Sequence, residues 1–219
     1  MRASVSESRT EASGALVRIV DDDADIRLAL QELMVSVGLD AVSFASPQEL
    51  LTNDAADRPG CFIMDVRMPG GSGLDLQRRF AAEGDARPII FLTGHGDIPM
   101  SVEAMKAGAV DFLTKPVRDQ ALLDVVAAAI ERDLAQRAIT QQTRRYVARL
   151  ETLTPREREV MAHVARGRLN KQIAYDLSIS VVTVKLHRSN VMRKMEVASV
   201  GELVRAWEAL PAHLRKART

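Results

Sequence analysis

An aspartate directly follows an apolar run in the segment CFIMDVRMPGGSG, residues 61–73. The four residues from Cys61 to Met64 are typical of a strand buried on both faces of a sheet. Asp65 comes next, and a loop rich in Gly and Pro follows it. Ligands of open α/β sheets bind just beyond the carboxyl ends of the strands, where Asp65 is expected. A ligand-binding carboxylate is one interpretation, and an aspartate that merely terminates the strand is the other.

Further polar residues follow other apolar runs in the same way. Asp21 and Asp22 come after a first short run, Thr93 ends another, and Lys115 comes shortly after the last. Each of them alone could be a helix cap or a surface charge. Because parallel strands deliver their carboxyl ends to one edge of the sheet, we expect all of them to lie near Asp65.

These residue types together are suited to phosphoryl chemistry. Three neighbouring aspartates repel one another and favour proton uptake or a hard cation, for which Mg²⁺ (or Mn²⁺) with its oxygen ligands is suitable. A carboxylate can also act as a nucleophile and form an aspartyl-phosphate. Such a reaction needs a cation opposite the incoming oxygens and a short hydroxyl donor, which Lys115 and Thr93 can supply. We find no general base and no nucleotide-binding glycine loop in this part of the chain.

The elements that must position these residues alternate regularly between strand and helix. Helical periodicity, proline at a first helical turn (Ser46-Pro47) and glycine at helix ends (Gly38, Gly108) separate the strands. One helix is expected to begin at Asp97 and another near Val117. The predicted strands are 16–20, 41–44, 61–64, 88–92 and 110–113. The predicted fold is therefore a doubly wound α/β domain with a five-stranded parallel sheet, of flavodoxin-like type.

The charge distribution divides the 219-residue chain. Residues 1–134 hold 13 basic and 22 acidic side chains, whereas residues 151–219 hold 13 basic and 7 acidic ones. An acidic part could bind a cation and a basic part a polyanion. The polar, Ser-rich residues 1–14 are expected to form a disordered leader and not a secretory signal. With a single cysteine and no membrane-spanning run, we expect a cytoplasmic protein without membrane contact.

The basic part has a helical pattern without strands. Thr154, Asn170 and Ser180 are each expected to cap a helix, and Thr154 begins a capping box with Glu157. The predicted helices are 155–166, 171–177, 181–195 and 200–209. The preceding segment, 135–150, is rich in Arg and Gln and has no acid. It is expected to be a helical linker, continuous or broken, which either pairs weakly with a partner or is solvated.

The helix that starts at residue 181 has two different faces. Its inner face carries Val184, His187, Val191 and Met195, and we expect His187 to be packed there or to face a partner instead of reading DNA. Its outer face carries Val182, Lys185, Leu186, Ser189 and Arg193. A short helix, a turn and such a second helix predict a helix-turn-helix, whose second helix can enter the major groove of DNA. Asn170 and Thr183 at the helix N-termini, with Arg188, are expected to contact phosphates.

The motifs VDDD, MDVRMPGGSG, LTGHG and DFLTKP, in this order, resemble a two-component receiver domain, which would cover residues 15–134. The resemblance implies that Asp65 is the phosphoacceptor. It implies a metal site of Asp21, Asp22, Asp65 and the backbone carbonyl of Arg67, and phosphoryl contacts from Thr93 and Lys115. Phe112 falls at the aromatic switch position, although a core aromatic is the alternative. Gly70-Gly71 departs from the family pattern, because many relatives carry an acidic or larger residue after the proline.

The stretch from LTPRE (153–157) to RKM (193–195) resembles the LuxR-type DNA-binding domain, expected at residues 151–219. This resemblance adds Lys171, in the Asn-Lys-Gln-Ile-Ala run, to the expected DNA contacts. Both parts together resemble a FixJ-like response regulator. Such a protein is expected to be phosphorylated by a sensor histidine kinase, to dimerise, to bind double-stranded DNA at a two-fold site and to act with RNA polymerase.

Two other functions remain open from the residues alone. A phosphatase with an aspartyl nucleophile and Mg²⁺ would need a second acid two residues after the nucleophile, where this chain has Arg67. A receiver-containing scaffold would bind protein through its helical tail. DNA binding with a steep salt dependence would separate the transcription factor from both.

Overall fold

The computed structural model describes residues 14–54, 57–94 and 98–215. The chain forms two compact units, which divide between Arg137 and Ala138. Nearly all of the predicted leader lies outside the described residues, and so does the predicted helix start at Asp97. Among the helices that are described, none is long and apolar enough to cross a membrane.

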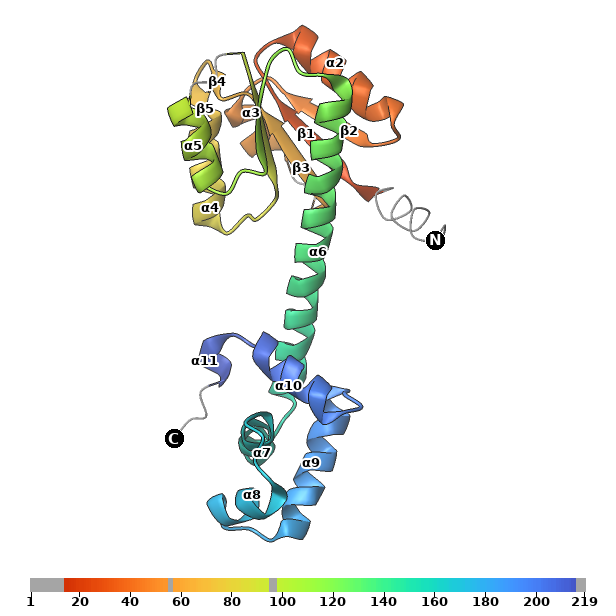
Figure 1. Cartoon of the computed structure of the whole chain (residues 1–219), viewed down its shortest axis with the longest axis vertical. Coiled ribbons are helices and arrows are strands. Elements are labelled where there is room, and N and C mark those ends of the chain that lie inside the picture. Colours follow the sequence, from red (N-terminus) through yellow and green to blue (C-terminus); the bar gives the residue numbers. More distant parts are fainter. Residues whose placement is uncertain (1–13, 55–56, 95–97, 216–219) are drawn as a thin grey trace. The chain divides into compact units, whose positions relative to one another are not determined.

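The first unit is built on a five-stranded parallel sheet with helices packed around it (Figure 1), and the strand order is β2-β1-β3-β6-β7. This confirms the predicted doubly wound fold, since the order is that of flavodoxin-like sheets. The strands are β1 (Leu16–Val20), β2 (Asp40–Phe44), β3 (Gly60–Met64), β6 (Ile89–Thr93) and β7 (Asp111–Thr114). The central strands β1, β3 and β6 are buried along their whole length, as their apolar runs predict.

Helices cover both faces of this sheet. The helices of this unit are α2 (Ala24–Ser36), α3 (Pro47–Asn53), α4 (Gly73–Glu83), α5 (Ile98–Lys106) and the first part of α6 (Asp119–Glu151). One apolar cluster joins the sheet to α2 and α6, and it includes Ile19 and Ile63 of the central strands. A second cluster joins the opposite face to α3, α4 and α5, and it includes Phe62 and Phe91 of the central strands. The alternation of side chains along each strand thus supplies both cores.

The structure adds two local details that the sequence leaves open. The loop after Asp65 is not wholly irregular, because it contains a small antiparallel hairpin of β4 (Arg67–Met68) and β5 (Gly71–Ser72). Strands of two residues are too short to leave a periodic pattern in the sequence. The helical linker predicted at 135–150 is a part of α6, which continues without a break from Asp119 to Glu151.

Helices joined by short loops make up the described part of the second unit, which contains no strand. Besides the end of α6, its helices are α7 (Pro155–Ala165), α8 (Asn170–Asp176), α9 (Val181–Met195), α10 (Val200–Ala209) and the short α11 (Ala212–Arg215). The capping box of Thr154 and Glu157 is present, and Ser180 caps α9. The predicted Asn170 cap is wrong, since Leu169 occupies that position and Asn170 is the first helical residue. The Gln172 side chain accepts from the Leu169 N–H at 2.9 Å and so supplies the terminal hydrogen bond.

Candidate functional site

Three aspartates meet at the carboxyl edge of the sheet, as the strand pattern predicts. Asp21 and Asp22 follow β1, and Asp65 follows β3, its direct neighbour in the sheet. One carboxylate oxygen from each of the three lies within 4.8 Å of the others. Asp21 and Asp65 are buried while Asp22 is exposed, so the cluster opens to solvent on one side.

Lys115 binds two of these carboxylates. Its Nζ lies 2.5 Å from Asp21 Oδ2 and 2.9 Å from Asp65 Oδ2. Its backbone N–H donates to the Thr93 carbonyl at 2.8 Å, which fixes the lysine beside the end of β6. Burial acts to lower the pKa of Lys115, but the hydrogen bonds to both aspartates outweigh it and raise that pKa above its usual value. The lysine is therefore a fixed positive charge at the centre of the cluster.

Burial also raises the pKa of Asp21 above its usual value, against the hydrogen bonds from Lys115 and from the Asp23 N–H. Mutual repulsion with Asp65 acts in the same direction as burial. A second cation would relieve this repulsion, and the donors available to it are hard carboxylate oxygens. The donor set of Asp21, Asp22 and Asp65 therefore fits Mg²⁺ or Mn²⁺.

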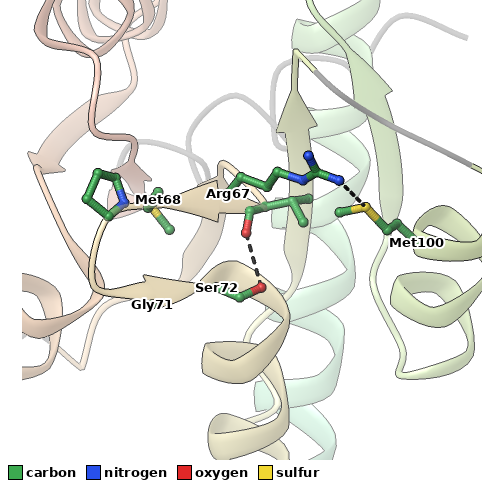
Figure 2. Close-up of a pocket in the computed structure, with 7 residues that line it drawn as sticks. Arg67, Met68, Gly71, Ser72 and Met100 are labelled. Carbon is green, nitrogen blue, oxygen red and sulfur yellow. Dashed lines mark hydrogen bonds between the residues drawn. The ribbon is translucent and has the colours of Figure 1, made fainter.

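The loop after Asp65 holds the carboxylate from the other side. The Arg67 N–H donates to Asp65 Oδ1 at 3.1 Å. The Arg67 side chain extends away to α5, where its Nη2 lies 3.7 Å from Met100 Sδ (Figure 2). The hairpin and Met100 line a pocket of about 560 Å³. None of the three aspartates lines this pocket, so it is separate from the acidic cluster.

Thr93 lies on β6, the neighbour of β3, and Phe112 lies on β7, the next strand of the sheet. Thr93 is the last residue of β6, is buried and pairs with Thr114 of β7. Phe112 is partly buried against the cluster under α3, α4 and α5, and its ring centroid is 6.2 Å from that of Phe91. The structure thus places Thr93 at the predicted edge and Phe112 one strand away, with an aromatic contact to the core.

Sequence reasoning missed two residues that shape this site. A Cβ at Gly73 would lie 2.4 Å from the Asp65 carbonyl oxygen, so only glycine lets α4 start this close to the aspartate. Arg27 donates from Nη1 to the Asp21 carbonyl at 2.7 Å. The signal for Gly73 was the glycine-rich loop, whereas Arg27 looks like any exposed helical arginine. The third acid of the run, Asp23, is the N-cap of α2.

The second unit presents a helix-turn-helix with the two predicted faces. On α9, Val184, Val191 and Met195 are buried, and His187 is partly buried with them. The residues predicted for the outer face are all exposed: Val182, Lys185, Leu186, Ser189 and Arg193. Lys171 on α8 is exposed as well. This geometry leaves the outer face of α9 free to enter a groove of DNA.

The residues predicted for phosphate contacts also make hydrogen bonds within the second unit. Arg188 Nη1 donates to Asn170 Oδ1 at 2.6 Å, which links α9 to the first residue of α8. Thr183 Oγ1 lies 2.8 Å from Ser180 Oγ, within the N-terminal cap of α9. The first contact fixes the Arg188 side chain at the start of α8, and the second fixes the Thr183 side chain at the start of α9. The pair of Asn170 and Arg188 therefore has a structural role, whether or not it touches DNA.

Comparison with known protein families assigns both units. Residues 17–127 match the response regulator receiver domain, and residues 151–207 match the bacterial regulatory proteins of the luxR family. Nodulation protein W from Bradyrhizobium diazoefficiens is 50% identical over 202 residues, covering 92% of this chain and 89% of that protein. Response regulator protein TodT from Pseudomonas putida is 46% identical over 196 residues, covering 90% and 86%.

Solved structures agree with this assignment. The response regulator StyR has a TM-score of 0.78 and 41% identity, with coverage of 89% of this chain and 98% of StyR. Full-length FixJ from B. japonicum has a TM-score of 0.55 and 39% identity, with coverage of 89% and 96%. The chain therefore belongs to the two-component response regulators that carry a LuxR-type DNA-binding domain, and it is a FixJ-like transcription regulator.

Proposed function

We propose that Asp65 is the phosphoacceptor of this response regulator. The observation that carries the proposal is the position of its carboxylate, which lies within 4.8 Å of two other acids and 2.9 Å from the Lys115 ammonium. A partner sensor histidine kinase supplies the phosphoryl group. The P–N bond to the kinase histidine breaks as a carboxylate oxygen of Asp65 forms the new P–O bond, and the electron pair returns to the imidazole.

The surrounding residues stabilise the transferred group. Lys115 gives up part of its contact with Asp21 and Asp65 to pair with a phosphoryl oxygen, and the Thr93 hydroxyl donates to another. Asp21, Asp22, Asp65 and the backbone carbonyl of Arg67 would hold Mg²⁺ or Mn²⁺, which supplies positive charge opposite the phosphoryl oxygens. The protein transfers the group onto itself and is not an enzyme with a separate substrate.

Phosphorylation acts by shifting an existing equilibrium. Thr93 moves toward the phosphoryl oxygens and Phe112 turns inward, which remodels the surface of α5 and β7. Val102 and Met105 are 44% and 45% exposed on α5, and we assign homodimerisation to this surface. Full reversal from a mostly inactive to a mostly active population needs about 5.5 kcal/mol of differential stabilisation.

The dimer presents two recognition helices to a DNA site with two-fold symmetry. The outer face of α9 reads base edges, and Asn170, Lys171, Thr183 and Arg188 hold the backbone. Bound at a promoter in this way, the protein controls transcription through RNA polymerase. The alternative is a scaffold whose helical tail binds only protein. The match of residues 151–207 to a DNA-binding family favours the transcription factor over this scaffold.

The test is phosphorylation of the full chain by a small acyl-phosphate donor with Mg²⁺. Intact mass should rise by one phosphoryl group in the wild type and in an Asp75→Asn control, whose carboxylate is exposed on α4. Asp65→Asn should abolish the rise, together with the donor-dependent dimer in sedimentation and the donor-dependent gain in DNA affinity. Wild-type phosphate incorporation by Asp65→Asn would contradict the assignment of the phosphoacceptor.

A further inference from the structure

The outer face of α9 carries two large apolar side chains in addition to its polar ones. Val182 is 76% exposed and Leu186 is 61% exposed. The core of the second unit takes its contacts from the opposite side of the helix, where Val184, Val191 and Met195 are buried. Packing within the described residues therefore does not account for an apolar pair on this face.

The two side chains are neighbours on the helix surface. Val182 and Leu186 are four residues apart, about one turn and about 6 Å along the helix axis. Base pairs in B-DNA repeat about every 3.4 Å, so this spacing corresponds to about two base-pair steps. Lys185 precedes Leu186 on the same exposed face and provides the charge that favours a polyanion as the occupant.

The apolar pair has a specific chemical counterpart in the major groove. The edges of the four base pairs present hydrogen-bond donors and acceptors there, and thymine adds a 5-methyl group. We propose that Val182 and Leu186 read the 5-methyl groups of two thymines in each half-site, about two base-pair steps apart. This inference rests on the proposed function, in which α9 is the recognition helix.

The test replaces single methyl groups in the DNA. The full chain, treated with an acyl-phosphate donor and Mg²⁺, selects sites from randomised duplexes, and each thymine of the selected site is then exchanged for deoxyuridine. This exchange removes the methyl group and keeps the hydrogen-bonding edge. At two positions of each half-site the exchange should weaken binding by about fourfold for each methyl group.

The protein variants should then assign each thymine to one side chain. Val182→Ala should remove the sensitivity to deoxyuridine at one position and Leu186→Ala at the other, while Val182→Ile should keep both. Both side chains are exposed, so the alanine variants should melt as the wild type does. Val200→Ala, on α10 and 44% exposed, is the matched apolar control and should leave both sensitivities unchanged.

The possible failures point to different statements. Selection of a common sequence in which every thymine tolerates deoxyuridine would overturn the reading of methyl groups and leave the proposed function intact. Sensitivity that survives in both alanine variants would also overturn it. Failure of any sequence to be enriched would instead contradict sequence-specific DNA binding by the proposed function.

Discussion

A methyl group added at Gly73 should slow phosphorylation of Asp65 although Gly73 carries no reactive atom. Gly73 is the first residue of α4, and its N–H donates to the Val66 carbonyl at 3.0 Å. The Cβ of an alanine there would lie 2.4 Å from the Asp65 carbonyl oxygen and 3.0 Å from the Phe91 ring. Backbone atoms cannot move aside as a flexible side chain can, so the strain falls on Asp65 itself.

The size of the effect follows from these distances. Ordinary contact for a Cβ begins at 3.4 Å, so the Asp65 backbone and the start of α4 must separate by about 1 Å. A misplacement of about 1 Å in a reacting group can cost about a hundredfold in rate. Overpacking of this kind also costs about 1–3 kcal/mol of stability, which leaves most of the chain folded. We expect Gly73→Ala to be phosphorylated about 10 to 100 times more slowly than the wild type.

The assay is the rate of mass increase with an acyl-phosphate donor and Mg²⁺. Gly94→Ala is the matched control, because Gly94 directly follows Thr93 at the same edge and a Cβ there has no atom within 4 Å. Circular dichroism should show a folded protein in both variants. A phosphorylation rate of Gly73→Ala within a factor of two of the Gly94→Ala rate would refute the argument from close approach.

Two further predictions concern stability. Asp54 accepts a hydrogen bond from Nε of the fully buried Arg18 at 2.7 Å. Asp54→Ala should therefore lower the free energy of unfolding of the first unit, measured in urea, by about 3–5 kcal/mol. Asp75→Ala, which removes an exposed ion pair, should lower it by at most about 1 kcal/mol. Equal losses in both variants would contradict this. Burial acts to raise the pKa of Glu157, but its hydrogen bond from Lys194 Nζ at 2.7 Å helps to hold that pKa below its usual value. The stabilisation is therefore present above the ordinary glutamate pKa of about 4.3 and is lost as the pH falls through the lower folded value. Glu157→Gln keeps the acceptor for the helix cap and should lower the free energy of unfolding of the second unit by about 1 kcal/mol at pH 7. The difference in unfolding free energy between wild type and variant should become smaller in acid. A difference that stays the same at all pH values would show that the charge is irrelevant.

The sequence predicts the acidic edge because the rule behind it depends only on chain order. Parallel strands joined by helices must place their carboxyl ends together, so Asp21, Asp65 and Thr93 meet without any knowledge of their side-chain contacts. The two-faced pattern of α9 is equally local, since the apolar positions recur at the helical period. Hydrophobic periodicity was thus enough to predict the sheet, the residues at its carboxyl edge and the exposed face of the recognition helix.

Contacts between polar groups that are distant in sequence could not be predicted in this way. Arg18 interrupts the apolar run of β1, yet its side chain is fully buried because Asp54, 36 residues later, and the Phe62 ring receive it. A buried charge is tolerated only with such partners, and nothing local announces them. The failed cap at Asn170 has the same origin, because the amide bonds to Arg188 of the next helix instead of to its own backbone.

The middle of the long helix α6 illustrates why the boundary between the two units is hidden in the sequence. An apolar pattern that fades after Leu134 suggests that the linker starts at residue 135. Polar contacts continue one turn further: Asp133 accepts from the Gly60 N–H at 2.9 Å and from Arg137 Nε at 2.8 Å, and Arg137 Nη1 lies 2.8 Å from Asp57. Asp133 is 4% exposed, so this attachment is part of the first unit although its residues read as a solvated helix. These contacts join residues that are 73 and 80 positions apart in the sequence, so no local pattern indicates them.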